Sequence, residues 1–163
     1  CLKVKIILNK NNNMLVESIN TGFSLKNSEV NSNIGERAHY EANTGVATVS
    51  VANSNLDGTG TLTNVLSTGA TTGSVGSLVK KITIKALANA TRGMVRLFIY
   101  DGSTTRLIEE FNINAVVQNS IQPSFEVSYD VDWSFGAGLT LKASTQYAET
   151  YSIAIEALDI IFP

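Results

Sequence analysis

The chain has 163 residues, of which 44% are hydrophobic and 16% are charged, and its formal net charge is -2 at pH 7. That length suits a single domain with a buried core, while the charged fraction lies well below the usual quarter. A nearly neutral chain offers no clustered basic face for a phosphate backbone, so we expect no nucleic-acid partner. No apolar run is long enough to cross a bilayer, and we expect no membrane partner.

The first 13 residues are rich in Lys and Asn and contain Cys1, the only cysteine, so no disulfide can form within the chain. A reduced thiol is favoured over a lipid anchor or an intermolecular bridge. Residues 4–8 predict a short strand, and without a hairpin partner nearby such a strand would pair with another subunit. Alternatively, the native protein starts at Met14 and residues 1–13 do not belong to it.

Residues 14–45 show no sustained hydrophobic period and are interrupted by Gly22, Gly35 and Gly45. We interpret residues 1–45 as an N-terminal extension, or arm, with at most one short turn of helix. An arm of that length is too long for an ordinary loop, so we expect it to lie on another surface.

Alternation of apolar and polar residues dominates from residue 46 onward. It is clearest in a predicted β-hairpin over 93–113, where Asp101-Gly102 supplies the turn. The other predicted strands are 46–52, 61–66, 78–87, 125–133, 139–143 and 151–162. Eight regularly spaced strands predict an all-β domain over 46–163, an antiparallel β-sandwich of the jelly-roll type. An immunoglobulin-like sandwich is the alternative, although its Cys–Trp–Cys signature is absent.

Few residues carry the chemistry of an active site. His39 is the only histidine, and no GxSxG elbow exists to build a catalytic triad with it, so a surface position is favoured. Asp130 and Asp132 share a strand face and could offer oxygen ligands to calcium. The surrounding sequence lacks a calcium-binding loop, and two solvated carboxylates are the better interpretation.

Glu109 and Glu110 fall on opposite faces of the second hairpin strand, so they cannot act as a simple pair. Glu109 lies on the apolar face, which is unusual for a carboxylate. We expect it near a strand end or a subunit interface, where Arg96 or Arg106 would pair with it.

Three further patterns are weighed against simpler explanations. The glycine-rich segment 69–76 lacks the Gly-Lys-Ser/Thr ending of a phosphate loop and precedes a strand rather than a helix, so phosphate binding is rejected. Asn89-Ala90-Thr91 is a glycosylation sequon that means little without a secretory signal. Phe125, Tyr129 and Trp133 could form a sugar-stacking platform, but an inward-facing core stripe is favoured. We therefore predict no catalytic, cofactor-binding or metal-binding residue, and no cofactor.

Three segments resemble a family of tailed-phage and prophage virion β-domains. They are NSNLDGTGTLTNVLSTGATTGSVGSLVKKITIKA, TRGMVRLFIYDGSTTRLIEEFNI and LTLKASTQYAETYSIAIEALD, and residues 1–45 lie outside the resemblance. The family is compatible with capsid decoration or head-fibre proteins and has no catalytic residues to carry over. The resemblance implies a non-enzymatic structural protein of the virion, made in the bacterial host cytoplasm, with capsid or other virion proteins as partners. Virion jelly rolls commonly close into trimers, so we expect a homotrimer whose arm contacts the capsid.

Two other functions remain open. A receptor- or glycan-binding jelly roll of a phage tail or fibre would carry exposed aromatic residues in its loops, and Phe135, in the predicted loop 134–138, is the only candidate. An enzyme is a more distant alternative, since it would need an acid–base pair such as Glu126 and Asp130 with a neighbour.

Overall fold

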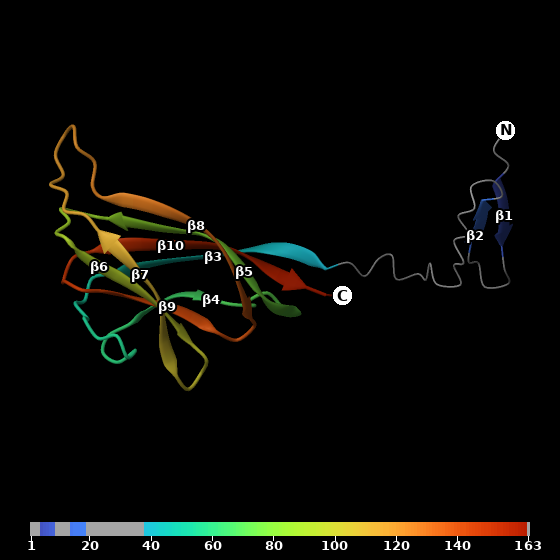
Figure 1. Ribbon diagram of the computed structural model, residues 1–163, viewed down its shortest axis with the longest axis horizontal. Helices are drawn as coiled ribbons and strands as arrows, with labels where there is room; N and C mark the ends of the chain where they lie inside the picture. The colour runs from blue at the N-terminus through green and yellow to red at the C-terminus, as the bar shows by residue number, and fades with distance from the viewer. Residues whose placement is uncertain (1–3, 9–13, 19–37, 163) are drawn as a thin grey trace. The chain divides into compact units, whose positions relative to one another are not determined.

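The computed structural model describes residues 4–8, 14–18 and 38–162, which contain β-strands and no helix (Figure 1). The chain divides into two compact units, Cys1–Arg37 and Ala38–Pro163. In the first unit, β1 (Val4–Leu8) pairs with β2 (Met14–Ser18) in an antiparallel hairpin. The strand predicted at 4–8 is confirmed, but it has a hairpin partner that sequence analysis missed. Cys1 lies outside the described residues.

The second unit is a sandwich of two antiparallel four-stranded sheets, in the orders β3-β10-β5-β8 and β4-β9-β6-β7. The chain passes from one sheet to the other at every connection except the β6–β7 hairpin, which gives the strand order of a jelly roll. The predicted all-β sandwich is therefore confirmed. Its strands are β3 (His39–Val49), β4 (Thr63–Ser67), β5 (Ser74–Ala86), β6 (Gly93–Tyr100), β7 (Thr105–Ile113), β8 (Glu126–Gly136), β9 (Thr140–Thr145) and β10 (Tyr151–Ile161).

The sandwich begins earlier than the predicted boundary at residues 45 and 46. β3 starts at His39 and pairs with β10 along its whole length, from His39 opposite Ile161 to Val49 opposite Tyr151. The first part of β3 escaped prediction because it is an edge strand whose early residues are mostly exposed, so no alternation marks it. Residues 38–45 therefore belong to the β-domain and not to an arm, and residues 19–37 lie outside the described residues.

Gly45, which interrupts the hydrophobic pattern of the sequence, is the point where β3 meets β4. A Cβ added there would lie 2.1 Å from the backbone oxygen of Val65, so only glycine permits this approach. The two sheets are thus drawn together along the side where β3 and β4 are the edge strands.

The core lies between the sheets and is built from the inward rows of the central strands β5 and β10. Ile82, Ile84, Ile153 and Ile155 are almost fully buried there, and these are the positions that the alternation of the sequence predicted. Phe125, just before β8, joins the same core cluster. Burial of such aliphatic side chains is the main stabilising contribution in a sandwich of this kind.

Candidate functional site

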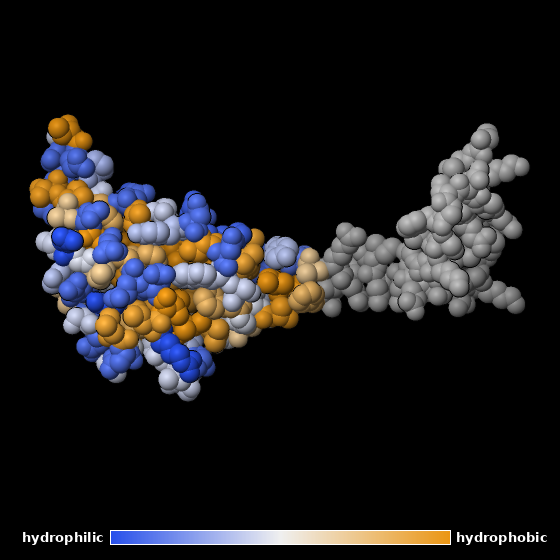
Figure 2. All heavy atoms as spheres, viewed as in Figure 1, coloured by the Kyte–Doolittle hydropathy of each residue, from blue (hydrophilic) through white to orange (hydrophobic). Residues whose placement is uncertain are grey.

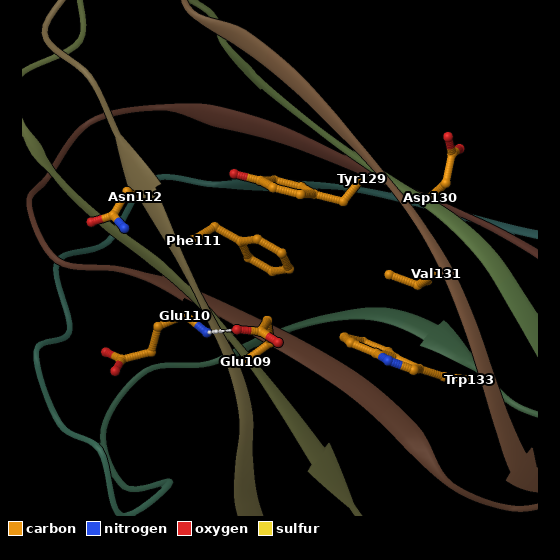
Figure 3. Close-up of a pocket in the computed structure, with 8 residues that line it drawn as sticks. All are labelled: Glu109, Glu110, Phe111, Asn112, Tyr129, Asp130, Val131 and Trp133. Carbon is orange, nitrogen blue, oxygen red and sulfur yellow. Dashed lines mark hydrogen bonds between the residues drawn. The ribbon is translucent and has the colours of Figure 1, made fainter.

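Side chains from β7 and β8 line an open groove on the side of the sandwich where these two strands are the sheet edges (Figure 3). It consists of two hollows with volumes of about 330 and 430 Å³, and both hollows are lined by Glu109 and Trp133. We name it the β7–β8 groove. Its lining residues are 108–112 from β7 and 129–135 from β8.

Aromatic side chains form the floor of the β7–β8 groove. Tyr129, Trp133 and Phe135 occupy alternate, half-buried positions of β8 and pack against the core from its open side. The ring of Phe111 lies 4.8 Å from that of Tyr129 at a tilt of 38°, and Trp133 meets Phe135 edge-to-face at 6.2 Å. Such pairs hold the rings in fixed orientations while leaving part of each half-buried β8 ring accessible.

Glu109 places a carboxylate over this aromatic floor. It lies opposite Leu97, an inward-facing residue that is 1% exposed, so Glu109 is on the inner face of its sheet. A β-bulge at Ile108 shifts the register between Glu109 and Leu107, which removes Leu107 from that face. The Glu109 carboxylate accepts a 3.1 Å hydrogen bond from the backbone N–H of Glu110 and points toward Trp133 (Figure 3).

The arginines expected to pair with Glu109 are engaged elsewhere. Arg96 Nε lies 2.8 Å from Glu110 Oε1 on the outer face, and Arg106 Nη1 lies 3.0 Å from Asp101 Oδ2 beside the hairpin turn. Hydrogen bonds from the backbone and side chains of that turn also hold the pKa of Asp101 well below its ordinary value. Among the described residues, Glu109 has no ion-pair partner, and the predicted pairing was wrong.

The carboxylates of the outer face of β8 form the rim of the groove. Asp130 and Asp132 are exposed, as predicted, and Lys80 pairs with Asp132. Glu126, the suggested catalytic partner of Asp130, lies 2.7 Å from Lys85 Nζ instead. Glu126 and Asp130 are four residue steps apart along the strand, about 13 Å along the backbone, which is too far for a shared proton.

His39 and the glycine-rich segment add no ligand chemistry in this structure. His39 is an exposed residue whose Nε2 lies 3.7 Å from Glu41 Oε1. Within 38–162 and the two N-terminal strands, no cluster of His, Cys, Asp or Glu is placed to hold a metal ion. The segment 69–76 leads into β5, a strand as predicted, and its Thr71 N–H donates to a carboxylate of the protein itself, Asp159.

Asp159 is the main polar residue that sequence analysis missed. It is fully buried on the inner face of β10 and accepts hydrogen bonds from Ser77 Oγ, Asn43 Nδ2 and Thr71 N. Burial by itself would raise the pKa of Asp159, but these hydrogen bonds outweigh it and lower the pKa to about 2. The alternation from Tyr151 onward already placed Asp159 in the buried row, and that position was the available signal.

Phe125, Tyr129 and Trp133, which could form a sugar-stacking platform or a core stripe, do not all have the same role. Phe125 is buried in the core, as favoured, whereas Tyr129 and Trp133 are half-buried and line the groove. Phe135 lies within β8 and not in a loop. In the sequon, Asn89 Oδ1 accepts the Gln118 N–H, so this segment has a structural role in the loops.

Comparison with known protein families gave no matching family model, and comparison with curated protein sequences gave no match. In the part of the chain that the structure describes, no helix is long and apolar enough to span a membrane.

Proposed function

We propose that this chain is a non-enzymatic structural protein of a phage virion that binds and stabilises the capsid surface. The observation that supports this most is how the resembling segments map onto the fold. They supply β4 and β5, then β6 and β7, then β9 and β10, so they form most of one continuous jelly roll. Jelly rolls recur in viral capsid and lectin domains.

A strip of apolar residues on the outer face of β3, β10 and β5 supports self-association. Register pairs place Tyr40 beside Ile160, Val46 beside Ala154, and Leu158 between Ala42 and Leu78. We name these seven residues the outer-face strip. Tyr40 and Val46 are 58% and 66% exposed, and Figure 2 shows apolar surface where β3 begins and β10 ends. Exposed apolar surface on a sheet with a free edge strand favours an oligomer, and we propose the homotrimer common among virion jelly rolls.

Attachment to the capsid is assigned to the N-terminal unit, residues 1–37. The test compares the full chain with residues 38–163 by co-sedimentation with purified capsids. The boundary is set at 38 because a deletion up to 45 would remove the first half of β3. We expect the shortened chain to keep its β-type circular dichroism spectrum and to stay in the supernatant. Pelleting of residues 38–163 with capsids as efficiently as the full chain would contradict the assignment.

The β7–β8 groove favours a second candidate function, a receptor-binding module of a tail or fibre. A structural decoration protein has no need of a preformed aromatic groove, whereas ligand sites are concave and mostly apolar with a few polar groups. Immunogold labelling of virions with an antibody to the sandwich distinguishes a head location from a tail location.

A further inference from the structure

The two sheets are closely packed at one pair of edge strands and leave the β7–β8 groove open at the other pair. On the opposite side of the sandwich, Gly45 lets β3 approach β4 until a Cβ would lie only 2.1 Å from a backbone atom. Between β7 and β8 the half-buried rings of Tyr129 and Trp133 stand at an open hollow. Half-buried aromatic rings held in fixed orientations by neighbouring rings form a preorganised surface for a flat apolar partner.

The charges of the groove narrow the class of ligand. Glu109 is the carboxylate that faces into the groove. Glu110 and Asp132 also line it but are paired with Arg96 and Lys80, and no Lys, Arg or His is among the lining residues. An anionic group placed beside Glu109 would be repelled. A second copy docking groove to groove would bring Glu109 against its own counterpart, since a twofold contact presents the same patch on both sides.

Glu109 also defines what the ligand must supply. An ionised carboxylate only accepts hydrogen bonds, and of the described donors only the Glu110 N–H reaches Glu109, at Oε1. A partner that fits therefore combines hydroxyl donors with an apolar face that can stack on an indole ring. Neutral sugars have both, because their ring C–H groups form apolar faces and their hydroxyl groups lie at the ring edges.

We infer that the β7–β8 groove binds a neutral oligosaccharide, whose ring stacks on Trp133 and whose hydroxyl groups donate hydrogen bonds to Glu109. The inference goes beyond the proposed capsid role and does not rest on it. A protein on the head surface and a protein on a fibre would both use such a groove to hold the particle at a glycan-coated surface.

Trp133 is the only tryptophan in the chain, so its intrinsic fluorescence reports directly on the groove. The full chain is titrated with neutral oligosaccharides of four to six units: cello-, malto-, xylo-, manno- and N-acetyl-chito-oligosaccharides. We expect at least one series to shift or quench the emission saturably, with an affinity that changes little between 50 and 500 mM NaCl. No saturable change with any of the five series would overturn the inference.

Variants test the two contacts separately by calorimetry with the sugar that binds. Trp133→Ala is expected to weaken affinity at least ~10-fold, as loss of a stacking anchor does, and Glu109→Gln is expected to weaken it several-fold. Tyr147→Ala, at a 47% exposed aromatic residue that does not line the groove, serves as the matched control and should bind like the parent. Equal loss in the control and in Trp133→Ala would overturn the groove assignment. Glu109→Gln covers the case in which Trp133→Ala does not fold.

Two other ligands of the β7–β8 groove would give different results in the fluorescence titration. The first is a basic peptide, tested with hexalysine. If hexalysine quenches Trp133 fluorescence with an affinity that falls steeply at high salt, and no sugar quenches it, the groove binds a basic peptide and the inference is overturned. A change in Trp133 emission that follows protein concentration and the light-scattering mass would assign it to a second copy. Co-sedimentation with capsids reads out the proposed function independently, so failure of one proposal leaves the other measurable.

Discussion

At the scale of a single residue, Asp159 joins three strands of one sheet to the β4–β5 connection. Its carboxylate on β10 accepts hydrogen bonds from Asn43 on β3, Ser77 on β5 and Thr71 in the β4–β5 connection. A buried charge is tolerated only when hydrogen bonds replace its lost hydration. Asp159 therefore stabilises the arrangement of these segments only as long as it stays ionised.

Asp159→Asn is expected to lower the free energy of unfolding by about 2 kcal/mol at pH 7, because an amide offers the same donors one acceptor oxygen and a misplaced NH₂ group. Urea denaturation followed by circular dichroism measures the change. Ser152→Ala, at an outward-facing position of the same strand, is the control and should change stability little. A midpoint for Asp159→Asn equal to that of the parent would contradict the role assigned to the carboxylate.

The lowered pKa of Asp159 also predicts that the free energy of unfolding falls in acid. The pKa of Asp159 is about 2 in the folded protein, below the ordinary value of 3.8, so the unfolded chain binds protons more readily than the folded one. The stabilising contribution is complete above the ordinary pKa and disappears as the pH falls through about 4 toward 2. Thermal unfolding between pH 6 and pH 2.5 should show the gap between the parent and Asp159→Asn narrowing. A gap that stays constant over this range would rule out ionisation of Asp159 as the cause.

At the scale of the β-strands, Gly45 sets the distance between β3 and β4. Gly45→Ala would place a methyl group against the Val65 carbonyl and force the two strands apart, which we expect to destabilise the sandwich by about 1–3 kcal/mol. Gly136→Ala on β8 is the matched control, because a Cβ there meets nothing within 4 Å. Denaturant midpoints of both variants decide the matter, and equal midpoints would contradict the close-approach role.

Elements with one buried and one solvated face were the ones that the sequence predicted well. The long strand β10 alternates because its inward row lies in the core. The β6–β7 hairpin was found from its residue types and its Asp101-Gly102 turn, although Val95–Phe98 are all buried. The first half of β3 could not be found, because its early residues are mostly exposed and it is recognised only through its pairing with β10. Local periodicity reports burial and does not report a hydrogen-bonding partner.

The candidate site was predictable only in part, for a related reason. Alternation placed Tyr129 and Trp133 on the inner face of β8, and that placement is correct. Whether the inner face of β8 is covered depends on which strand forms the facing edge of the other sheet. The strand order of the fold decides this, and local sequence does not. The bulge at Ile108, which separates Leu107 from the Glu109 face, likewise leaves no mark in the alternation.

The outer-face strip makes a prediction at the scale of the whole molecule. The full chain should elute as a trimer, with three times the 17.4 kDa monomer mass by light scattering. Val46→Glu, which places a charge in the strip, should reduce the mass to that of the monomer. Val117→Glu, at a loop position that is 71% exposed, should leave the trimer intact. A monomeric parent, or a Val46→Glu protein that stays trimeric, would contradict an interface at this strip.

The pairing of the first and last strands of the sandwich has a practical consequence. Because His39 lies opposite Ile161, the chain enters and leaves the β-domain at neighbouring points on one end of it (Figure 1). Domains with adjacent ends tolerate circular permutation well. A short glycine-serine linker between these two residues, with new ends opened in the exposed tip of the β6–β7 hairpin, should yield a permutant with the same core. A cargo fused to those new ends would leave the domain from the sheet β4-β9-β6-β7 instead of from the sheet that holds β3 and β10.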